Sequence, residues 1–252
     1  MNKAYWDGLA NTFTSDVFEV FKNDSRGLIR SAIRDHGDRE RIACDIGCGV
    51  GSLLPKLADT FGKVIAIDIS SKCLQKAEEN CGAFTNIVYL NRDLAREQTK
   101  IPKNDFSICV NALIFPSMAG RINFIDNSVA ALKRGGILVL VVPALESALL
   151  RNHREVQWLL KTEGVATTAE QIDFIGLDGI NAKKLSLGLV NIDGVKTKHF
   201  LKEEIMIMFE QRGMAVLEIA KLEYAWDTEF FKPPKWMQAP YPWDWFVLAK
   251  KK

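Results

Sequence analysis

The sequence has no long apolar run, and this argues against a membrane-spanning helix. The most apolar stretch, Ile137 to Leu150, is broken by Pro143 and Glu146 and is too short to cross a bilayer. Residues 1–12 mix polar and apolar side chains and lack the uninterrupted apolar core of a signal peptide. We therefore expect a cytoplasmic protein with no membrane association.

Paired cysteines and a strong excess of one charge are also absent. The five cysteines are odd in number, and no two have the C-x-x-C spacing. This argues against a zinc site or a disulfide framework, so we expect no metal and a reducing compartment. Because 33 Lys and Arg face 31 Asp and Glu, the formal net charge is only +2. Nucleic-acid-binding proteins usually have a strongly basic face, so we expect no DNA partner.

The composition is that of an ordinary globular protein, and the pattern of apolar residues indicates the fold class. The 252 residues are 48% hydrophobic and 25% charged, and they can bury a sizeable core in one domain. Helical patterns at 52–61, 72–79 and 124–132 alternate with short apolar strands at 41–46, 64–67, 87–90, 106–110 and 137–142. This alternation predicts an α/β fold, a doubly wound parallel sheet with helices on both faces.

The remaining segments suggest how one domain is organised. We expect an N-terminal helical cap over residues 1–40, a ligand-binding core over 41–143, a substrate cap inserted after the fifth strand over 144–200, and C-terminal core strands within 201–252. The N-terminal segment and the insert would together form the substrate pocket. Within the insert, a hairpin is predicted at 189–200 because Asp193-Gly194 suits a tight turn. Two further strands are predicted at 215–220 and 245–249.

The clearest functional signal is the glycine-rich loop Asp45-Ile46-Gly47-Cys48-Gly49-Val50-Gly51 between a predicted strand and helix. Glycines let the backbone turn tightly and approach a ligand, and Asp68 at the next strand end can accept the hydroxyls of a ribose. A nicotinamide fingerprint would need a third glycine where Ser52 stands. The carboxylate of Asp45 opposes a pyrophosphate but suits an ammonium or sulfonium, which favours S-adenosylmethionine over a nicotinamide cofactor.

These motifs, in this order, resemble the class I S-adenosylmethionine-dependent methyltransferases. The resemblance rests on the glycine loop, Asp68 in Val-Ile-Ala-Ile-Asp, Asp93 in Asn-Arg-Asp-Leu, the fourth strand ending at Asn111, and Leu-Lys-Arg-Gly-Gly before the fifth strand. It covers about residues 40–145, and the terminal strands extend it to about 250. It implies a Rossmann-like, mostly parallel sheet of seven strands whose last strand is antiparallel.

The resemblance also implies which residues bind the cofactor. They stand in the loops that follow the strands. Asp45 and Asn111 would lie near the methionine end, Asp68 would hold the ribose, and Asp93 would accept from the adenine amino group. The other residues implied are Gly47, Cys48, Gly49, Gly51, Ile69 beside the adenine and the backbone of Leu94.

The catalytic residues are less determined, because a methyl group on a sulfonium is already activated. A base is needed only if the acceptor must lose a proton. His153 and His199 are the candidates for a base or a substrate contact, with a surface or packing role as the alternative for each. Asn111 is not followed by the Pro-Pro-aromatic sequence found in methyltransferases of exocyclic amines, which argues against methylation of DNA bases.

We predict methyl transfer to oxygen or nitrogen of a small-molecule acceptor. Aromatic residues near the N-terminus (Tyr5, Trp6, Phe13) and at 226–245 could pack an apolar acceptor, or they could pack a loop or form the interface of a homodimer. Two alternatives stay open: a methyltransferase acting on a macromolecule such as tRNA or protein, and a non-catalytic S-adenosylmethionine-binding protein. A nicotinamide oxidoreductase is disfavoured by Asp45 and Ser52.

Overall fold

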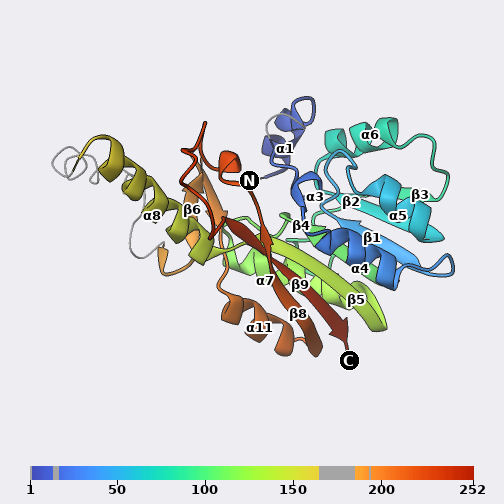
Figure 1. Ribbon diagram of the computed structural model, residues 1–252. Helices are drawn as coiled ribbons and strands as arrows, with labels where there is room; N and C mark the ends of the chain where they lie inside the picture. The colour runs from blue at the N-terminus through green and yellow to red at the C-terminus, as the bar shows by residue number, and fades with distance from the viewer. Residues whose placement is uncertain (1, 14–16, 165–184, 193) are drawn as a thin grey trace.

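The structure, a computed structural model, describes residues 2–13, 17–164, 185–192 and 194–252. Its centre is a seven-stranded sheet of order β3-β2-β1-β4-β5-β9-β8 (Figure 1). The strands are β1 Ile42–Ile46, β2 Lys63–Asp68, β3 Ile87–Asn91, β4 Asn104–Val110, β5 Leu132–Pro143, β8 Met214–Glu223 and β9 Trp243–Lys251. The first five pair in parallel, and β9 runs antiparallel between β5 and β8. The predicted doubly wound sheet with an antiparallel last strand is confirmed.

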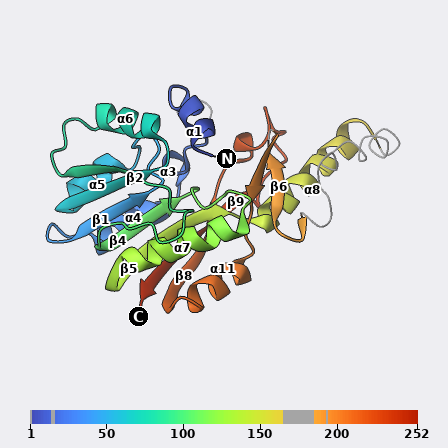
Figure 2. The same cartoon turned by 180° about the vertical axis from the view of Figure 1, so that it is seen from behind.

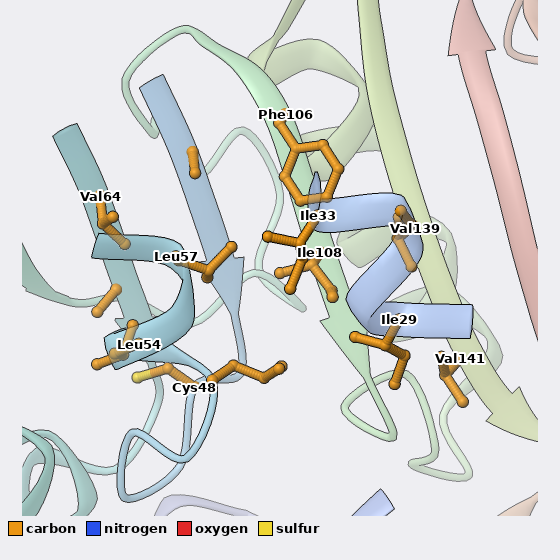
Figure 3. Packing of buried hydrophobic residues seen from close by; sticks show 14 of the residues in the cluster. Ile29, Ile33, Cys48, Leu54, Leu57, Val64, Phe106, Ile108, Val139 and Val141 are labelled. Atoms are coloured by element: carbon orange, nitrogen blue, oxygen red, sulfur yellow. The ribbon is translucent and has the colours of Figure 1, made fainter. Parts of the chain in front are cut away.

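Helices cover both faces of this sheet. On one face, α4 (Leu28–His36), α5 (Leu54–Thr60) and α6 (Ser71–Asn80) pack against one set of strand residues; Figure 3 shows Ile29 and Ile33 of α4 beside Val139 and Val141. On the other face lie α7 (Met118–Ala131) and α11 (Lys202–Glu210), seen in front of the sheet in Figure 2. Because successive strand residues point to opposite faces, two covered faces require the continuous apolar strands of the sequence.

Two boundaries around α7 differ from the sequence prediction. The helix begins at Met118 rather than near 124, because the Ser117 side chain caps it by accepting from the backbone N–H of Gly120 at 3.2 Å. Gly135 and Gly136 do not end the helix but lie inside β5. Gly135 has φ +78°, and the pairing of β4 with β5 shifts in register nearby. The glycines therefore allow the backbone of β5 to depart from regular strand geometry at this point.

The N-terminal region is helical as expected, but in short pieces: α1 (Lys3–Leu9), α3 (Val20–Asn23) and α4. Asp24 begins α4 by accepting from the backbone N–H groups of Leu28 at 2.9 Å and Ile29 at 2.8 Å. Asp7 fastens α1 to the start of α6, because its carboxylate accepts from the Ser70 hydroxyl at 2.6 Å. This contact holds α1 beside α6 (Figure 1).

The insert after β5 contains α8 (Leu145–Thr162), which projects away from the sheet (Figure 1), and the predicted hairpin of β6 (Leu189–Ile192) and β7 (Val195–Lys198). The hairpin is attached to the core by the backbone N–H of Lys198, which donates to Ile114 at 2.7 Å, and that of Phe200, which donates to Pro143 at 2.8 Å. Residues 165–184 and the turn residue Asp193 lie outside the described residues. Within the described part of the chain, no helix is long and apolar enough to span a membrane.

The aromatic C-terminal segment mainly packs the molecule. Trp226, Phe230 and Met237 form a small buried cluster against Trp158 of α8, and Trp243 and Trp245 belong to the sheet core. These contacts agree with the interpretation that the aromatic residues pack a long loop.

Candidate functional site

A cavity of about 560 Å³ lies at the carboxyl ends of the parallel strands. Its walls are the loops after β1, β2, β3 and β4, the start of α7 and the N-terminal segment. Such a position is expected, because in open α/β sheets the strand ends nearest the topological switch point form the ligand crevice. Nine of the ten residues predicted to bind the ligand line it: Asp45, Gly47, Cys48, Gly49, Asp68, Ile69, Asp93, Leu94 and Asn111. Gly51 does not.

The glycine loop needs its glycines for two different reasons. Gly47 has φ +77°, and a Cβ there would collide with the Cβ of Ala112 after β4. Gly51 has φ +90°, and a Cβ there would lie 3.1 Å from Ala77 Cβ and 3.2 Å from Cys81 Sγ on α6. Gly47 thus keeps the loop close to β4 at the cavity wall, whereas Gly51 permits helix packing behind it.

Asp68, at the end of β2, holds the loop in place. One of its carboxylate oxygens accepts from the backbone N–H of Gly49 at 2.9 Å, and the other accepts from that of Ser70 at 2.8 Å. Burial raises the pKa of Asp68, and these backbone donors oppose the rise. Each oxygen retains a lone pair, so the carboxylate can still accept hydroxyl groups from a ligand.

Asp45 lies at the end of β1 with only 2% of its surface exposed. Within the described part of the chain, its Oδ2 has no hydrogen-bond partner. Burial, and then the charge of Asp68, raise the pKa of Asp45 to about 7. An unpaired buried carboxylate oxygen is costly, and a cationic ligand group would satisfy it.

Asn111 follows β4 with φ +48°. Its Nδ2 donates to Oδ2 of Asp244 on β9 at 3.0 Å, and the Tyr224 hydroxyl donates to the same oxygen at 2.8 Å. Because the amide N–H side is held by Asp244, Oδ1 of Asn111 remains as a buried acceptor with no partner among the described residues. Sequence reasoning missed Asp244 and Tyr224; the available signal was one acid inside the apolar strand Trp-Asp-Trp-Phe-Val-Leu-Ala.

The far end of the cavity is built around Asp93 and Leu94. Asp93 turns the chain after β3 by accepting from the backbone N–H of Ala95 at 3.0 Å. Asn127 of α7 donates to the Leu94 carbonyl at 2.9 Å, fixing this loop against the helix. Ile69 also lines the cavity. Asp93 could therefore accept a hydrogen bond from the edge of a planar polar ring, and Ile69 could pack on its face.

The N-terminal segment supplies the wall opposite the strand ends. The side chains that line the cavity here are mostly aromatic or aliphatic: Trp6, Phe13, Val17, Phe18, Val20 and Phe21. Phe13 lies directly on the loop, since a Cβ on Gly49 would come within 2.7 Å of its Cζ. Glu19 is the one acid among these neighbours, and sequence reasoning did not select it.

The structure does not bring the two candidate histidines to the cavity. His153 is exposed on α8, and His199 is buried beside β7 with Nδ1 3.2 Å from the Thr197 carbonyl oxygen. Burial lowers the pKa of His199 to about 4, so it is neutral near pH 7. The described parts of the insert, 144–164, 185–192 and 194–200, contribute no lining residue.

Comparison with known proteins agrees with this architecture. Residues 43–136 match a family model described as a methyltransferase domain, and they contain the glycine loop, Asp68, Asp93 and Asn111. Magnesium-protoporphyrin O-methyltransferase of Synechocystis is 30% identical over 116 residues, which are 44% of this chain and 49% of that protein. The chain spans about half the length of this relative and about three fifths of the next ones.

Solved structures share the fold over nearly the whole chain. Magnesium protoporphyrin IX methyltransferase from Synechocystis with bound S-adenosylmethionine has a TM-score of 0.60 at 16% identity, covering 99% of this chain and 95% of that one. The N-methyltransferase NodS from Bradyrhizobium japonicum, in complex with S-adenosylhomocysteine, has a TM-score of 0.62 at 13% identity, covering 99% and 97%. At these identities the likeness establishes the fold.

Proposed function

We propose that the protein transfers a methyl group from S-adenosylmethionine to a small molecule, because residues 43–136 match a family model described as a methyltransferase domain. The observation that carries the proposal is that Oδ2 of Asp45, buried beside the glycine loop, has no hydrogen-bond partner among the described residues. A cofactor with an ammonium group satisfies this oxygen, whereas a pyrophosphate is repelled by it.

The cavity offers a partner for each part of this cofactor. Asp45 and Oδ1 of Asn111 would accept from the ammonium group, and Asp68 would accept from the ribose hydroxyls. Asp93 and the Leu94 backbone would meet the edge of the adenine, with Ile69 against its face. Gly47, Cys48 and Gly49 would lie beneath the methionine portion, and Gly51 would shape the loop from behind.

The chain's own contribution to the reaction is binding, alignment and exclusion of water. When bound, S-adenosylmethionine supplies a methyl group on a positively charged sulfur; transfer breaks the carbon–sulfur bond, and its electron pair stays on sulfur. The aromatic wall formed by Trp6, Phe13 and Phe18 would enclose the acceptor and hold its oxygen or nitrogen in line. Since His153 and His199 lie away from the cavity, we assign neither of them as a base.

The small-molecule class is supported by the shape of the site and by the relatives. An apolar cavity of about 560 Å³ suits a compact acceptor. Among the relatives, magnesium-protoporphyrin O-methyltransferase and demethylmenaquinone methyltransferase are named for small molecules.

Calorimetric titration tests the cofactor directly. Wild type should bind S-adenosylmethionine and S-adenosylhomocysteine and should not bind NADH, while Asp45→Asn should weaken both S-adenosyl compounds by at least about tenfold. Radiolabelled methyl donor with fractionated cell extract then identifies the acceptor class. Label found only in tRNA or protein would favour the macromolecular alternative, and binding without any label would favour a non-catalytic binding protein.

The location and assembly of the protein are also proposals. The five cysteines are all free and buried, which supports a location of the protein in the reducing cytoplasm. Association of two copies through the aromatic C-terminal segment is supported by Phe231, whose surface is 85% exposed. Analytical ultracentrifugation of wild type and Phe231→Ser tests it.

A further inference from the structure

The cavity wall contains buried polar atoms that lack hydrogen-bond partners among the described residues, and all of them are hydrogen-bond acceptors. Within the described part of the chain these are both carboxylate oxygens of Glu19, Oδ2 of Asp45 and Oδ1 of Asn111. A buried acceptor left unpaired costs free energy, so this wall favours ligands that bring donors and positive charge. The ammonium group of the cofactor proposed above would donate to Asp45 and Asn111, but that cofactor offers no assigned partner to Glu19.

The carboxylate of Glu19 is buried but has fewer polar partners than a buried carboxylate usually has. Its side chain is only 9% exposed, and Oε1 has no partner among the described residues. Oε2 lies 2.6 Å from Nζ of Lys22, outside hydrogen-bond geometry, and the Lys22 side chain is 69% exposed. Because the Lys22 ammonium lies mostly in solvent, its attraction to Glu19 is screened, and another cation that approaches from the cavity can replace it.

Contacts of the neighbouring residue place Glu19 toward the Asn111 end of the cavity. The ring of Phe18 packs edge-on against that of Tyr224, with centroids 4.8 Å apart. Tyr224 donates to Asp244, the carboxylate that holds Asn111. The chain at residues 18–19 therefore lies on the Asn111 side of the cavity, and Glu19 lines that cavity.

The surroundings of Glu19 fit a cation with an apolar body. Phe13, Phe18 and Phe21 line the same wall, and aromatic faces attract cations while they bury hydrocarbon. A carboxylate acceptor would instead meet the like charge of Glu19. The charge of the wall thus separates amines from acids.

We infer that the methyl acceptor carries a basic nitrogen, cationic near neutral pH, that pairs with Glu19 while its apolar portion packs on the aromatic N-terminal wall. Because a protonated nitrogen has no lone pair, this nitrogen orients the acceptor, and the methyl group goes to another oxygen or nitrogen of the same molecule. This inference rests on the proposed function and narrows its acceptor to the class of apolar amines. Glu19 is then a specificity-determining residue, separate from those assigned to the cofactor.

Matched probes test the inference without knowledge of the natural acceptor. Protein saturated with S-adenosylhomocysteine is titrated with 2-phenylethylamine and with 2-phenylethanol, which differ in the charged group. Wild type should bind the amine at least about tenfold more tightly than the alcohol, and Glu19→Gln should reduce this preference to within about threefold. Lys22→Met should strengthen amine binding, because the competing cation is removed. The affinity for S-adenosylhomocysteine should change by less than about threefold in both variants.

The outcomes separate the two proposals. If wild type shows no preference for the amine, whether both probes bind or neither does, the inference is overturned while the proposed function stands. A preference that survives in Glu19→Gln overturns it too, as does a tenfold loss of S-adenosylhomocysteine binding in that variant, because Glu19 would then serve the cofactor. If wild type does not bind S-adenosylhomocysteine at all, both proposals fall. If Glu19→Gln fails to fold, the comparison of 2-phenylethylamine with 2-phenylethanol on wild type still tests whether the site prefers an amine.

Discussion

The amide of Asn111, at the end of β4, donates to the carboxylate of Asp244 on β9 at 3.0 Å. The Tyr224 hydroxyl donates to the same carboxylate oxygen. Asp244 and Tyr224, from the C-terminal part of the chain, therefore orient the Asn111 amide so that its Oδ1 remains available as an acceptor. Asp244 is buried, and burial raises its pKa, which the donors from Asn111 and Tyr224 oppose.

Asp244→Ala should destabilise the protein far more than Tyr224→Phe. The first leaves two buried donors without their acceptor and is expected to cost about 2–4 kcal/mol in free energy of unfolding, whereas the second removes one donor and is expected to cost about 1 kcal/mol. Urea unfolding of both variants measures the difference. Equal losses would mean that the bond from Asn111 contributes nothing.

Asp45→Asn should stabilise the ligand-free protein at alkaline pH. Burial, followed by the charge of Asp68, raises the pKa of Asp45 from 3.8 to about 7 in the folded state. The folded protein thus holds this proton more tightly than the unfolded chain, and stability falls as pH rises from about 4 to about 7. We expect Tm of the variant to exceed that of wild type by on the order of 5 °C at pH 8, and we expect this difference to shrink as pH falls and to vanish near pH 4. A constant difference at the two pH values would contradict this.

Binding of S-adenosylmethionine should weaken in acid for the same reason. Below about pH 7 the carboxyl group of Asp45 is protonated in the free protein, and pairing with an ammonium group requires loss of that proton. Kd should therefore rise about fivefold between pH 7 and pH 6 in wild type and stay flat in Asp45→Asn. Calorimetry in two buffers of different ionisation enthalpy counts the proton. Binding without proton release at pH 6 would mean that Asp45 does not meet the cation.

Gly47→Ala should abolish cofactor binding, and Gly213→Ala provides the matched control. Both glycines have positive φ, +77° and +66°, so alanine strains the backbone at each. Only at Gly47 would the added methyl collide with Ala112; at Gly213 no atom of the described residues lies within 4 Å of the added methyl. We expect Gly213→Ala to cost about 1 kcal/mol and to leave binding unchanged. Similar binding by the two variants would show that the loop tolerates displacement from β4.

The elements of the sheet and the order of its site residues could be predicted because they depend on local sequence. Apolar strands, the glycine loop, Asp68 and Asp93 are each recognisable within a few residues, and parallel strands bring their carboxyl ends to one edge. The start of α7 was placed too late because its first turn, from Met118 to Ile122, is mostly exposed and carries little apolar periodicity.

The sequence by itself determined the fold class, the loop and the acids at the strand ends, because hydrophobic periodicity and turn chemistry act over short distances. Only the tertiary structure decided that Gly51 packs behind the loop, that His153 and His199 lie away from the cavity, and that Glu19 and Asp244 border it or hold its residues. These facts depend on contacts across many residues, 133 between Asn111 and Asp244, and such contacts leave no periodic trace in the chain.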